Sequence, residues 1–226
     1  MNNVSGKKVT NASLFSCDTV YIRPLIESVE YPWEILSLIP SYISSLIACG
    51  IEGYTEYRPG VLIGQNVTIA PTATIGTNVI IGSDTNIGPG AYIRQDVLIG
   101  PGCNVGNSTE LKNCVLMEHV QVPHYNYVGD SVLGAHAHLG AGAVCSNLKS
   151  DKKNIVIHGD EEYITGLRKI GGFLGDHAEI GCHCVINPGT IIGQSTSVYP
   201  LTAVRGVIPG GLIVKSMNNM IKREDI

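Results

Sequence analysis

Large aromatic side chains are scarce in this sequence: one Trp and two Phe occur among 226 residues. A core without large rings must pack with small and β-branched residues, which here are accompanied by 27 glycines. The length suits one domain with a small appendage and excludes two full catalytic domains. An excess of positive charge is also missing, since the net charge is −4. This balance argues against nucleic acid as a partner.

Long apolar runs and paired cysteine motifs are missing as well. No stretch approaches twenty uninterrupted apolar residues, and Met1–Thr10 has no signal-peptide pattern. The sequence therefore predicts a soluble, cytoplasmic protein without membrane contact. The cysteines form an odd set without CxxC spacing, so we expect reduced thiols and no structural disulfide. They are Cys17, Cys49, Cys103, Cys114, Cys145, Cys182 and Cys184.

A repeat of six residues dominates the rest of the chain. Its first series is Ile63, Ile69, Ile75, Ile81, Ile87, Ile93, Ile99, Val105, Leu111, Met117 and Pro123. The residue two positions before each is mostly small or β-branched, as in Val61, Val67, Ala73, Val79, Thr85 and Ala91. The phase slips by one residue between Val128 and Leu133 and resumes at Leu139 and Cys145. After an interruption the series returns as Leu174, Ile180, Ile186, Ile192, Val198 and Val204.

A period of six fits neither an amphipathic helix nor a hairpin sheet. It fits a coil of three short strands joined at three corners, in which each hexad supplies one flat side. Residues eighteen apart then lie above one another, at about the 4.8 Å spacing of paired strands. Chance repetition in a β-sandwich is the alternative, but a sandwich has no reason to keep one phase through eleven steps. The sequence therefore predicts an all-β parallel β-helix over residues 61–215.

Residues 1–60 lack the repeat and form an N-terminal arm. Within it, Tyr31–Cys49 has the composition of an apolar helix, with Pro32 near its start and Gly50 after its end. Pro40 is expected to kink or divide this helix. Repeat proteins need a cover over the exposed strand groups of a terminal coil. We therefore expect this helix to cap one end of the solenoid.

Two further segments interrupt or follow the coils. The inserted loop 147–173 contains a hairpin pattern, with strands near Ile155–Ile157 and Tyr163–Thr165. Such a loop projects from the prism toward a ligand or a neighbouring subunit, or is a solvated decoration. The C-terminal tail, residues 216–226, is expected to be a short helix or disordered.

Charged residues replace the usual Gly or Ala after four of the repeating aliphatic residues: Arg94, Lys112, Glu118 and His124. Arg94 and Lys112 are eighteen residues apart, so one should lie above the other on the same edge. Two stacked cations without an intervening acid repel each other unless an anion such as a phosphate lies between them. His124 belongs to another edge and would meet this pair only across a subunit contact. Solvated corner residues are the alternative reading of each residue taken alone.

Four segments resemble the acetyltransferase domain of bifunctional glucosamine-1-phosphate acetyltransferase/N-acetylglucosamine-1-phosphate uridylyltransferase enzymes, which belong to the hexapeptide-repeat acyltransferase superfamily. They are Ile87–Arg94, Val105–Asn113, His124–Asp130 and Leu139–Asn147. The pattern of Gly166–Lys169 followed by Ile186–Gly189 is more similar to archaeal-type sugar-phosphate nucleotidylyltransferases. The resemblance implies left-handed coils, a homotrimer with sites between subunits, and acetyl transfer from acetyl-CoA to the amine of an amino-sugar 1-phosphate.

The resemblance also implies roles for individual residues. His124 matches the family's catalytic base, and Arg94 and Lys112 match its sugar-phosphate ligands. Tyr127 and Asn147 match its substrate contacts, and Lys152 or Lys153 is near the position of the lysine in the family's substrate-binding loop. Ala141 and Cys182 match its acetyl-CoA groove. A sugar ammonium must lose a proton before it attacks a thioester, and an imidazole can accept that proton near neutral pH. Cations that bind the phosphate would hold the amine against the thioester carbonyl. No metal is implied.

The chain departs from the family at several positions. His138 stands where the bacterial family has Asn, Leu148 replaces a Tyr, and Ala143 replaces a Thr. These changes bear on the choice of acceptor, glucosamine- or galactosamine-1-phosphate, more than on the reaction. Residues 1–60 contain no Gly-rich nucleotidyl-transfer motif, so we expect no uridylyltransferase activity.

Three alternative functions remain open at this stage. The spacing of His119 and His124 is similar to that of two zinc ligands of γ-carbonic anhydrases, but Ser83 stands where the third ligand is expected. A non-enzymatic sugar-phosphate-binding or assembly module would keep the site without turnover. O-acetylation of another sugar is the third alternative, because this fold serves many acceptors.

Overall fold

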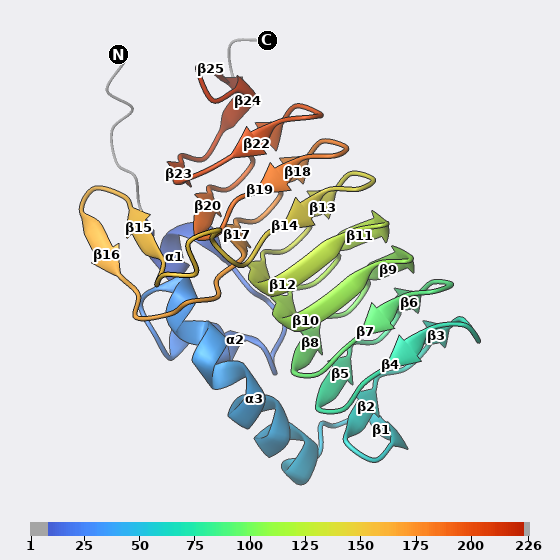
Figure 1. Cartoon of the computed structure of the whole chain (residues 1–226). Helices are drawn as coiled ribbons and strands as arrows, with labels where there is room; N and C mark the ends of the chain where they lie inside the picture. Colours follow the sequence, from blue (N-terminus) through green and yellow to red (C-terminus); the bar gives the residue numbers. More distant parts are fainter. Residues whose placement is uncertain (1–8, 224–226) are drawn as a thin grey trace.

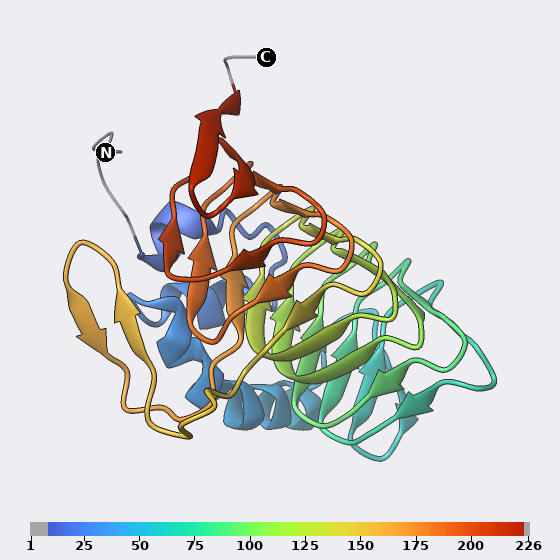
Figure 2. The same ribbon diagram turned by 45° about the horizontal axis from the view of Figure 1, so that its top comes forward.

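The computed structural model describes residues 9–223, in which short strands wind around a three-sided prism (Figures 1 and 2). Face A contains β2 (Val61–Ile63), β5 (Val79–Ile81), β8 (Val97–Ile99), the second halves of β10 (Glu110–Leu116) and β12 (Tyr127–Leu133), β17 (Gly172–Leu174), β20 (Thr190–Ile192) and β23 (Val207–Ile208). Face B contains β3 (Thr68–Ile69), β6 (Asn86–Ile87), β9 (Asn104–Asn107), β11 (Gln121–His124), β13 (His138–Leu139), β18 (Glu179–Ile180), β21 (Ser197–Val198) and β24 (Leu212–Ser216). Face C contains β4 (Thr74–Ile75), β7 (Tyr92–Ile93), the first halves of β10 and β12, β14 (Val144–Cys145), β19 (Val185–Ile186) and β22 (Ala203–Val204).

The structure confirms the left-handed parallel β-helix of hexapeptide repeats, and the parallel register has the expected coil length. Val79 pairs with Val97, and Ile81 pairs with Ile99, each eighteen residues further along the chain. Side chains that point inward form one buried column through the prism. The narrow interior selects the small and β-branched residues that the repeat supplies, which explains why large rings are not needed there.

The repeat slips earlier than the sequence indicated. Leu116 pairs with Ile99 below it and Leu133 above it, so two successive coils have seventeen residues each. Leu116 therefore enters the inner column, whereas Met117 packs outside it. The expected inward positions Met117 and Pro123 were wrong. The missing residue is at the turn from face C to face A, where β10 and β12 each continue around the corner.

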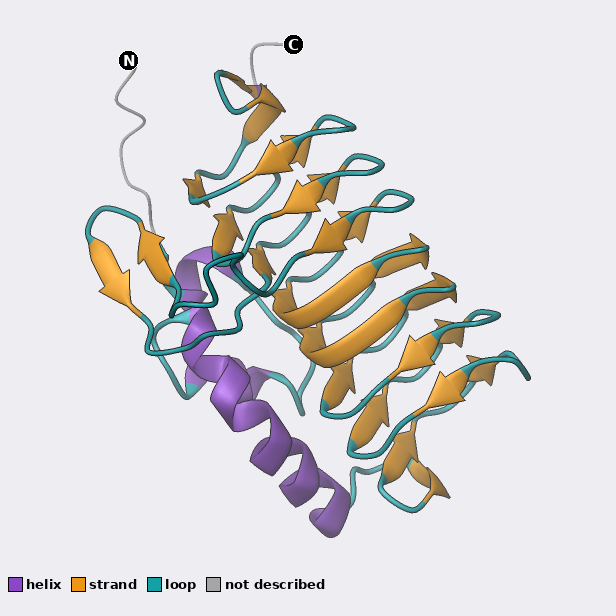
Figure 3. Ribbon diagram, in the orientation of Figure 1, coloured by secondary structure: helices purple, strands orange, loops and turns teal. Residues whose placement is uncertain are grey.

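The N-terminal arm covers the flank of the prism and not its end. It contains α1 (Asn11–Leu14), α2 (Arg23–Glu27) and α3 (Pro32–Cys49), and α3 lies along face A (Figure 3). Outward side chains of face A, such as Ile80, Leu98 and Phe173, form a second buried cluster with the arm. These are the middle residues of apolar triplets, which need a cover on their outer side. The helix was expected over a terminal coil, but the apolar surface that it buries is on this flank.

Helix α3 is continuous through Pro40. At its start the Glu34 carboxylate accepts a hydrogen bond from the Tyr31 N–H at 2.9 Å, and Gly50 ends it with a φ of 76°. The helix is long and apolar enough to cross a membrane by those criteria alone. However, Trp33, Ile35 and Ile39 on it are buried within the protein. Of the two effects expected of Pro40, a kink or a division, the division was wrong, because one helix runs from Pro32 to Cys49.

Antiparallel strands cover the two ends of the solenoid. At the first coil β1 (Thr55–Arg58) pairs with β2, and at the last coil β25 (Asn219–Lys222) pairs with β24. Pairing removes the exposed strand edge that a terminal coil presents. The tail was expected to be helical or disordered. It forms a hairpin as far as residue 222, and Met217 and Met220 in this hairpin pack against the core.

The inserted loop forms the predicted hairpin, with β15 (Val156–His158) antiparallel to β16 (Glu162–Ile164). It stands beside the helical arm (Figures 1 and 2). Ile155 and Ile157 are buried, and the Tyr163 ring lies 5.3 Å from the Trp33 ring, centroid to centroid. The hairpin is thus packed against the arm and is more than a solvated decoration.

Candidate functional site

The corner between faces C and A, here called edge CA, carries the two predicted cations. Tyr92 and Ile93 pair with Glu110 and Leu111, so Arg94 and Lys112 are stacked on this edge as predicted. The premise that no acid accompanies them was wrong. Arg94 lies 3.0 Å from the Glu110 carboxylate, which raises the pKa of Arg94, and Lys112 lies 3.3 Å from Asp130. The repulsion expected between the cations is therefore offset by two carboxylates.

Asp130 connects Lys112 to two other predicted substrate residues. Its buried carboxylate accepts hydrogen bonds from the Asn147 amide at 2.6 Å and the Asn113 amide at 2.9 Å. Asn147 also donates to the Tyr127 hydroxyl at 3.1 Å. Burial, together with the Asp130 and Glu110 carboxylates, raises the pKa of Tyr127, so its phenol is neutral at physiological pH. Lys112, Tyr127 and Asn147 thus form one hydrogen-bonded cluster.

Gly129 and Asp130 are functional candidates that sequence reasoning missed. A Cβ atom at Gly129 would collide with the Tyr127 hydroxyl and lie 3.0 Å from the Asn147 amide. Any side chain there would displace both groups. Asp130 has a φ of 49°, in the left-handed region that Asp tolerates better than most residues. The shortened turns of the seventeen-residue coils place Asp130 directly above Asn113. The sequence did contain a signal for Asp130, because this ionisable residue lies within the phase slip between Val128 and Leu133.

The corner between faces B and C, edge BC, brings together the predicted base and the predicted cofactor residues. Backbone hydrogen bonds join successive coils there, from Gly142 N–H to the His124 carbonyl at 2.9 Å and from His183 N–H to the Ala141 carbonyl at 2.8 Å. His124, Ala141 and Cys182 therefore form one column. The His124 and Cys182 side chains are exposed. Within residues 9–223, the Ala141 N–H has no backbone acceptor, whereas its neighbours on both sides donate to the adjacent coils.

Edges BC and CA lie on opposite sides of face C, so His124 and the Arg94–Lys112 pair do not meet within one chain. The loop lysines Lys152 and Lys153 are exposed in the turn before the hairpin, and the nearby Lys149 pairs with Asp151 at 3.4 Å. This turn is not joined to the Asp130 cluster by any hydrogen bond among the described residues. The structure thus divides the predicted residues into three groups. One group lies on edge CA and one on edge BC, here called the two half-sites, and the third is the lysine loop.

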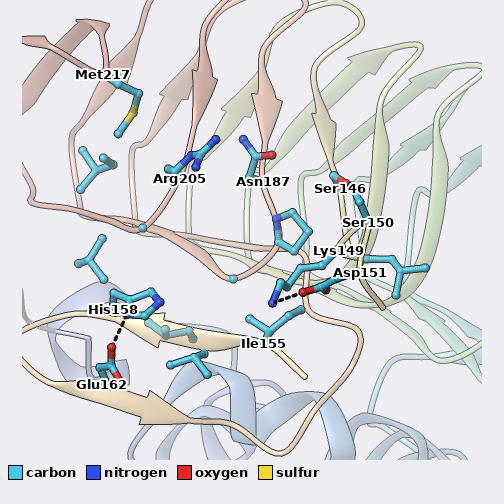
Figure 4. A pocket seen from close by; sticks show the side chains of 18 of the residues that line it. Ser146, Lys149, Ser150, Asp151, Ile155, His158, Glu162, Asn187, Arg205 and Met217 are labelled. Atoms are coloured by element: carbon cyan, nitrogen blue, oxygen red, sulfur yellow. Dashed lines mark ion pairs between the residues drawn. The ribbon is translucent and has the colours of Figure 1, made fainter. Parts of the chain in front are cut away.

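A cavity of about 1240 Å³ lies between the β15–β16 hairpin and edge CA (Figure 4). It was not predicted from the sequence. Asn187 and Arg205 line it from the solenoid side, and both continue the column of Lys112 toward the C-terminus. Ile155 lines the hairpin side, and Met217 and its neighbours line the C-terminal end. The cavity thus combines apolar walls with an exposed guanidinium.

The remaining histidines are positioned elsewhere. His119 is on the corner between faces A and B, edge AB, where its ring stacks on His136 with centroids 4.8 Å apart. It is separated from His124 by the width of face B, unlike a pair of ligands to one ion. Among the described residues no group of three or more His, Cys, Asp or Glu side chains is arranged to hold a metal. His138 lies on face B, 2.8 Å from the Glu179 carboxylate.

The fold is that of a hexapeptide-repeat β-helix protein. A family model described as the GMPPB C-terminal domain matches residues 77–166. The bifunctional protein GlmU of Methanococcus maripaludis strain S2 is 32% identical over 182 residues, covering 79% of this chain and 44% of the relative. A bifunctional sugar-1-phosphate nucleotidylyltransferase/acetyltransferase of Sulfurisphaera tokodaii is 39% identical over 97 residues, covering 42% of this chain and 24% of the relative. The acetyltransferase domain of PglB from Neisseria gonorrhoeae, solved with acetyl coenzyme A, superimposes with a TM-score of 0.32 at 16% identity, covering 83% of this chain and 66% of that one.

The two sequence matches confirm the resemblance to GlmU-type proteins. Over the aligned residues, the chain is similar to bifunctional sugar-1-phosphate nucleotidyltransferase/acetyltransferase proteins of the GlmU type. It spans less than half the length of these two relatives. The segment matched by the family model includes every predicted site residue except Cys182.

Proposed function

We propose that the chain is an acetyl-CoA-dependent N-acetyltransferase whose acceptor is an amino-sugar 1-phosphate, either glucosamine-1-phosphate or galactosamine-1-phosphate. The observation that carries this proposal is the division of the site into two columns. One column offers cations and amides for a sugar phosphate, at Arg94, Lys112 and Asn147. The other offers an exposed histidine beside a free backbone N–H, at His124 and Ala141.

The two half-sites complement each other across a homotrimer, which we propose as the active assembly. Face A is covered by the chain's own helices, and face B is lined by polar residues that include the Asn86–Asn104 pair. In contrast, large apolar side chains are exposed on face C and edge BC: Tyr92, Tyr125, Val185, Tyr199 and Leu201. Exposed apolar patches mark association surfaces. A subunit packed there would place its edge CA against edge BC of its neighbour.

In the proposed mechanism, Arg94 and Lys112 bind the phosphate of the acceptor, with Tyr127 and Asn147 beside the sugar. His124 of the adjoining edge accepts a proton from the sugar ammonium. The free amine attacks the thioester carbonyl of acetyl-CoA, and the Ala141 N–H donates a hydrogen bond to the oxyanion that forms. Collapse of this intermediate breaks the C–S bond, and the proton that the attacking nitrogen loses is taken up by the departing coenzyme A thiolate.

We place acetyl-CoA along the groove between the two edges. Ala141 and Cys182 would line one side, and the cavity of about 1240 Å³ beside Asn187 and Arg205 would line the other. The apolar walls of the cavity can accommodate a pantetheine chain, and the exposed Arg205 guanidinium can bind the phosphates of the coenzyme. Lys152 or Lys153 would close over this groove. A cytoplasmic location is part of the proposal and agrees with seven free cysteines.

Release of coenzyme A in the presence of each amino-sugar 1-phosphate tests this function. We expect turnover with at least one of them and a loss of about 100-fold or more in kcat for His124→Ala, because general-base catalysis contributes that much. His177→Asn, at a turn on edge AB, is the matched control and should retain activity. Acceptor binding without turnover by the wild-type protein would instead support a non-enzymatic binding module, and undiminished turnover by His124→Ala would remove His124 from the mechanism.

A further inference from the structure

The two acid–base pairs on edge CA differ in their exposure to water. The Arg94 and Glu110 side chains are 38% and 36% exposed, whereas the Lys112 and Asp130 side chains are 19% and 6% exposed. An exposed ion pair is screened and separates easily. A buried pair that loses one partner leaves an uncompensated charge, so it resists separation. The two carboxylates next to the predicted phosphate ligands are therefore not equivalent.

Asp130 is held by more than its charge. It accepts hydrogen bonds from the Lys112 ammonium at 3.3 and 3.4 Å, the Asn113 amide at 2.9 Å and the Asn147 amide at 2.6 Å. Its own backbone is fixed by the Gly171 N–H, which donates to the Asp130 carbonyl at 2.7 Å. Two side chains proposed to contact the substrate are thus oriented by one buried carboxylate.

The resting cluster contains two cations and two carboxylates, so its charges balance. An arriving phosphate adds negative charge and must draw a cation away from its acid. Arg94 can leave Glu110 at little cost because both groups are already hydrated. Lys112 stays with Asp130 and can still donate to the phosphate, because an ammonium has three hydrogens.

We propose that Asp130 is a positioning residue that fixes Lys112 and Asn147 for phosphate binding, whereas Glu110 is a displaceable counter-ion that releases Arg94 to the incoming anion. The inference rests on the proposed function for the identity of the ligand as a sugar phosphate. It concerns binding alone and requires no acetyl transfer.

Calorimetric titration of the full chain with glucosamine-1-phosphate, and with inorganic phosphate, tests the inference through the sign of two effects. Glu110→Gln and Asp130→Asn each remove one negative charge with little change of shape. Simple repulsion between carboxylate and phosphate predicts tighter binding in both variants. We expect binding about threefold to tenfold tighter in Glu110→Gln. In Asp130→Asn we expect binding about tenfold or more weaker, because the Lys112 and Asn147 side chains lose the carboxylate that orients them.

Asp96→Asn is the matched control, since Asp96 occupies the corresponding turn one coil below Asn113 and accepts a hydrogen bond from Asn78 at 2.7 Å. It should change the affinity by less than about twofold. Thermal unfolding establishes that each variant is folded. If Asp130→Asn does not fold, Asn113→Ala loosens Asp130 without changing the charge and should weaken binding by about threefold.

Equal or tighter binding by folded Asp130→Asn overturns the inference, as does weaker binding by Glu110→Gln, unchanged binding by Asn113→Ala or the absence of any binding by the wild-type chain. The expected pattern of affinities in a chain that releases no coenzyme A would refute the proposed acetyl transfer and leave the inference standing. The two proposals therefore fail separately.

Discussion

Edges AB and CA of the same prism both carry columns of ionisable side chains, but the chain's own N-terminal arm closes edge AB. There the Glu118 carboxylate accepts hydrogen bonds from the Asp18 N–H at 2.8 Å and the Thr19 hydroxyl at 2.7 Å. Asp176 accepts from the Ser16 N–H at 2.8 Å and the Ser16 hydroxyl at 2.7 Å. On edge CA, Arg94 and Glu110 remain partly open to water.

This difference separates structural from functional polar residues. Burial raises the pKa of Glu118, but hydrogen bonds from Asp18 and Thr19 outweigh it, and the pKa is lowered overall. The Glu118 carboxylate already accepts hydrogen bonds from the arm, so its role is to attach the arm to the prism. Among the described residues, the Arg94 and Lys112 side chains donate hydrogen bonds only to Glu110 and Asp130, so each retains unused donors. A column of charged side chains is a candidate binding site when some of its hydrogen-bond donors have no partner within the protein.

The largest expected effect is on stability at the closed edge. Asp176→Ala should destabilise the chain by about 3 kcal/mol, because several hydrogen bonds to a buried carboxylate are lost. For a chain of this length that corresponds to a fall of roughly 6–12 °C in Tm. Asp84→Asn, at an exposed turn of the same edge whose φ of 59° Asn tolerates, is the control and should change Tm by much less. Equal effects of the two substitutions, measured by thermal unfolding, would contradict the anchoring role of Asp176.

An intermediate effect is expected on function at the open edge. Arg94→Gln should raise the KM for the amino-sugar phosphate by about tenfold, because a charge-assisted contact is lost. Its stability should change by less than about 1 kcal/mol, since the pair with Glu110 is exposed. Arg23→Gln removes the similarly exposed pair with Asp18 at the arm and should leave KM unchanged. A large fall in Tm with unchanged KM for Arg94→Gln would assign Arg94 to structure.

The smallest effect concerns the stacked histidines of edge AB. Partial desolvation within the stack and the imidazoles of His119 and His177 lower the pKa of His136 below its ordinary value of 6.5. Since the unfolded chain then binds the proton more readily, stability is fully present above that ordinary value and falls as the pH drops below it. His136→Asn keeps a residue that tolerates the φ of 59° and should flatten the decline of Tm between about pH 6.5 and 5.

The matched control for this prediction is His183→Asn, an exposed histidine with a φ of 55° on edge BC. It should leave the slope of Tm against pH unchanged. Parallel slopes for wild type and His136→Asn would show that the stack does not contribute to the pH dependence.

The sequence predicted the fold well because the physical constraint is local and repeated. Every coil needs small or branched inward residues at fixed spacing, and one chain shows this pattern many times. The stacking of Arg94 on Lys112 followed from the same period. The period did not predict where the arm packs. A signal was nevertheless present, because the middle residues of Val79-Ile80-Ile81 and Val97-Leu98-Ile99 are apolar and point outward. Apolar residues on both sides of a strand indicate a cover on its outer face.

The acids of the site were missed because they depend on three-dimensional register. Glu110 meets Arg94 across neighbouring coils, and Asp130 reaches Lys112 only because a turn is one residue shorter than the repeat. The sequence indicated a slip only between Val128 and Leu133, so the earlier slip before Leu116, which sets this register, was missed. The cavity beside the hairpin was missed for a related reason, since it depends on how the inserted loop folds back.

The proposal that edge CA of one subunit completes edge BC of the next is tested most directly by mixing two inactive variants. Lys112→Ala lacks one half-site and His124→Ala lacks the other, so each trimer alone should be inactive. Trimers refolded from equal amounts of both should recover about a quarter of wild-type activity, because that fraction of randomly formed interfaces is intact in both halves. Mixed trimers that form and remain as inactive as the separate variants would contradict a site shared between subunits.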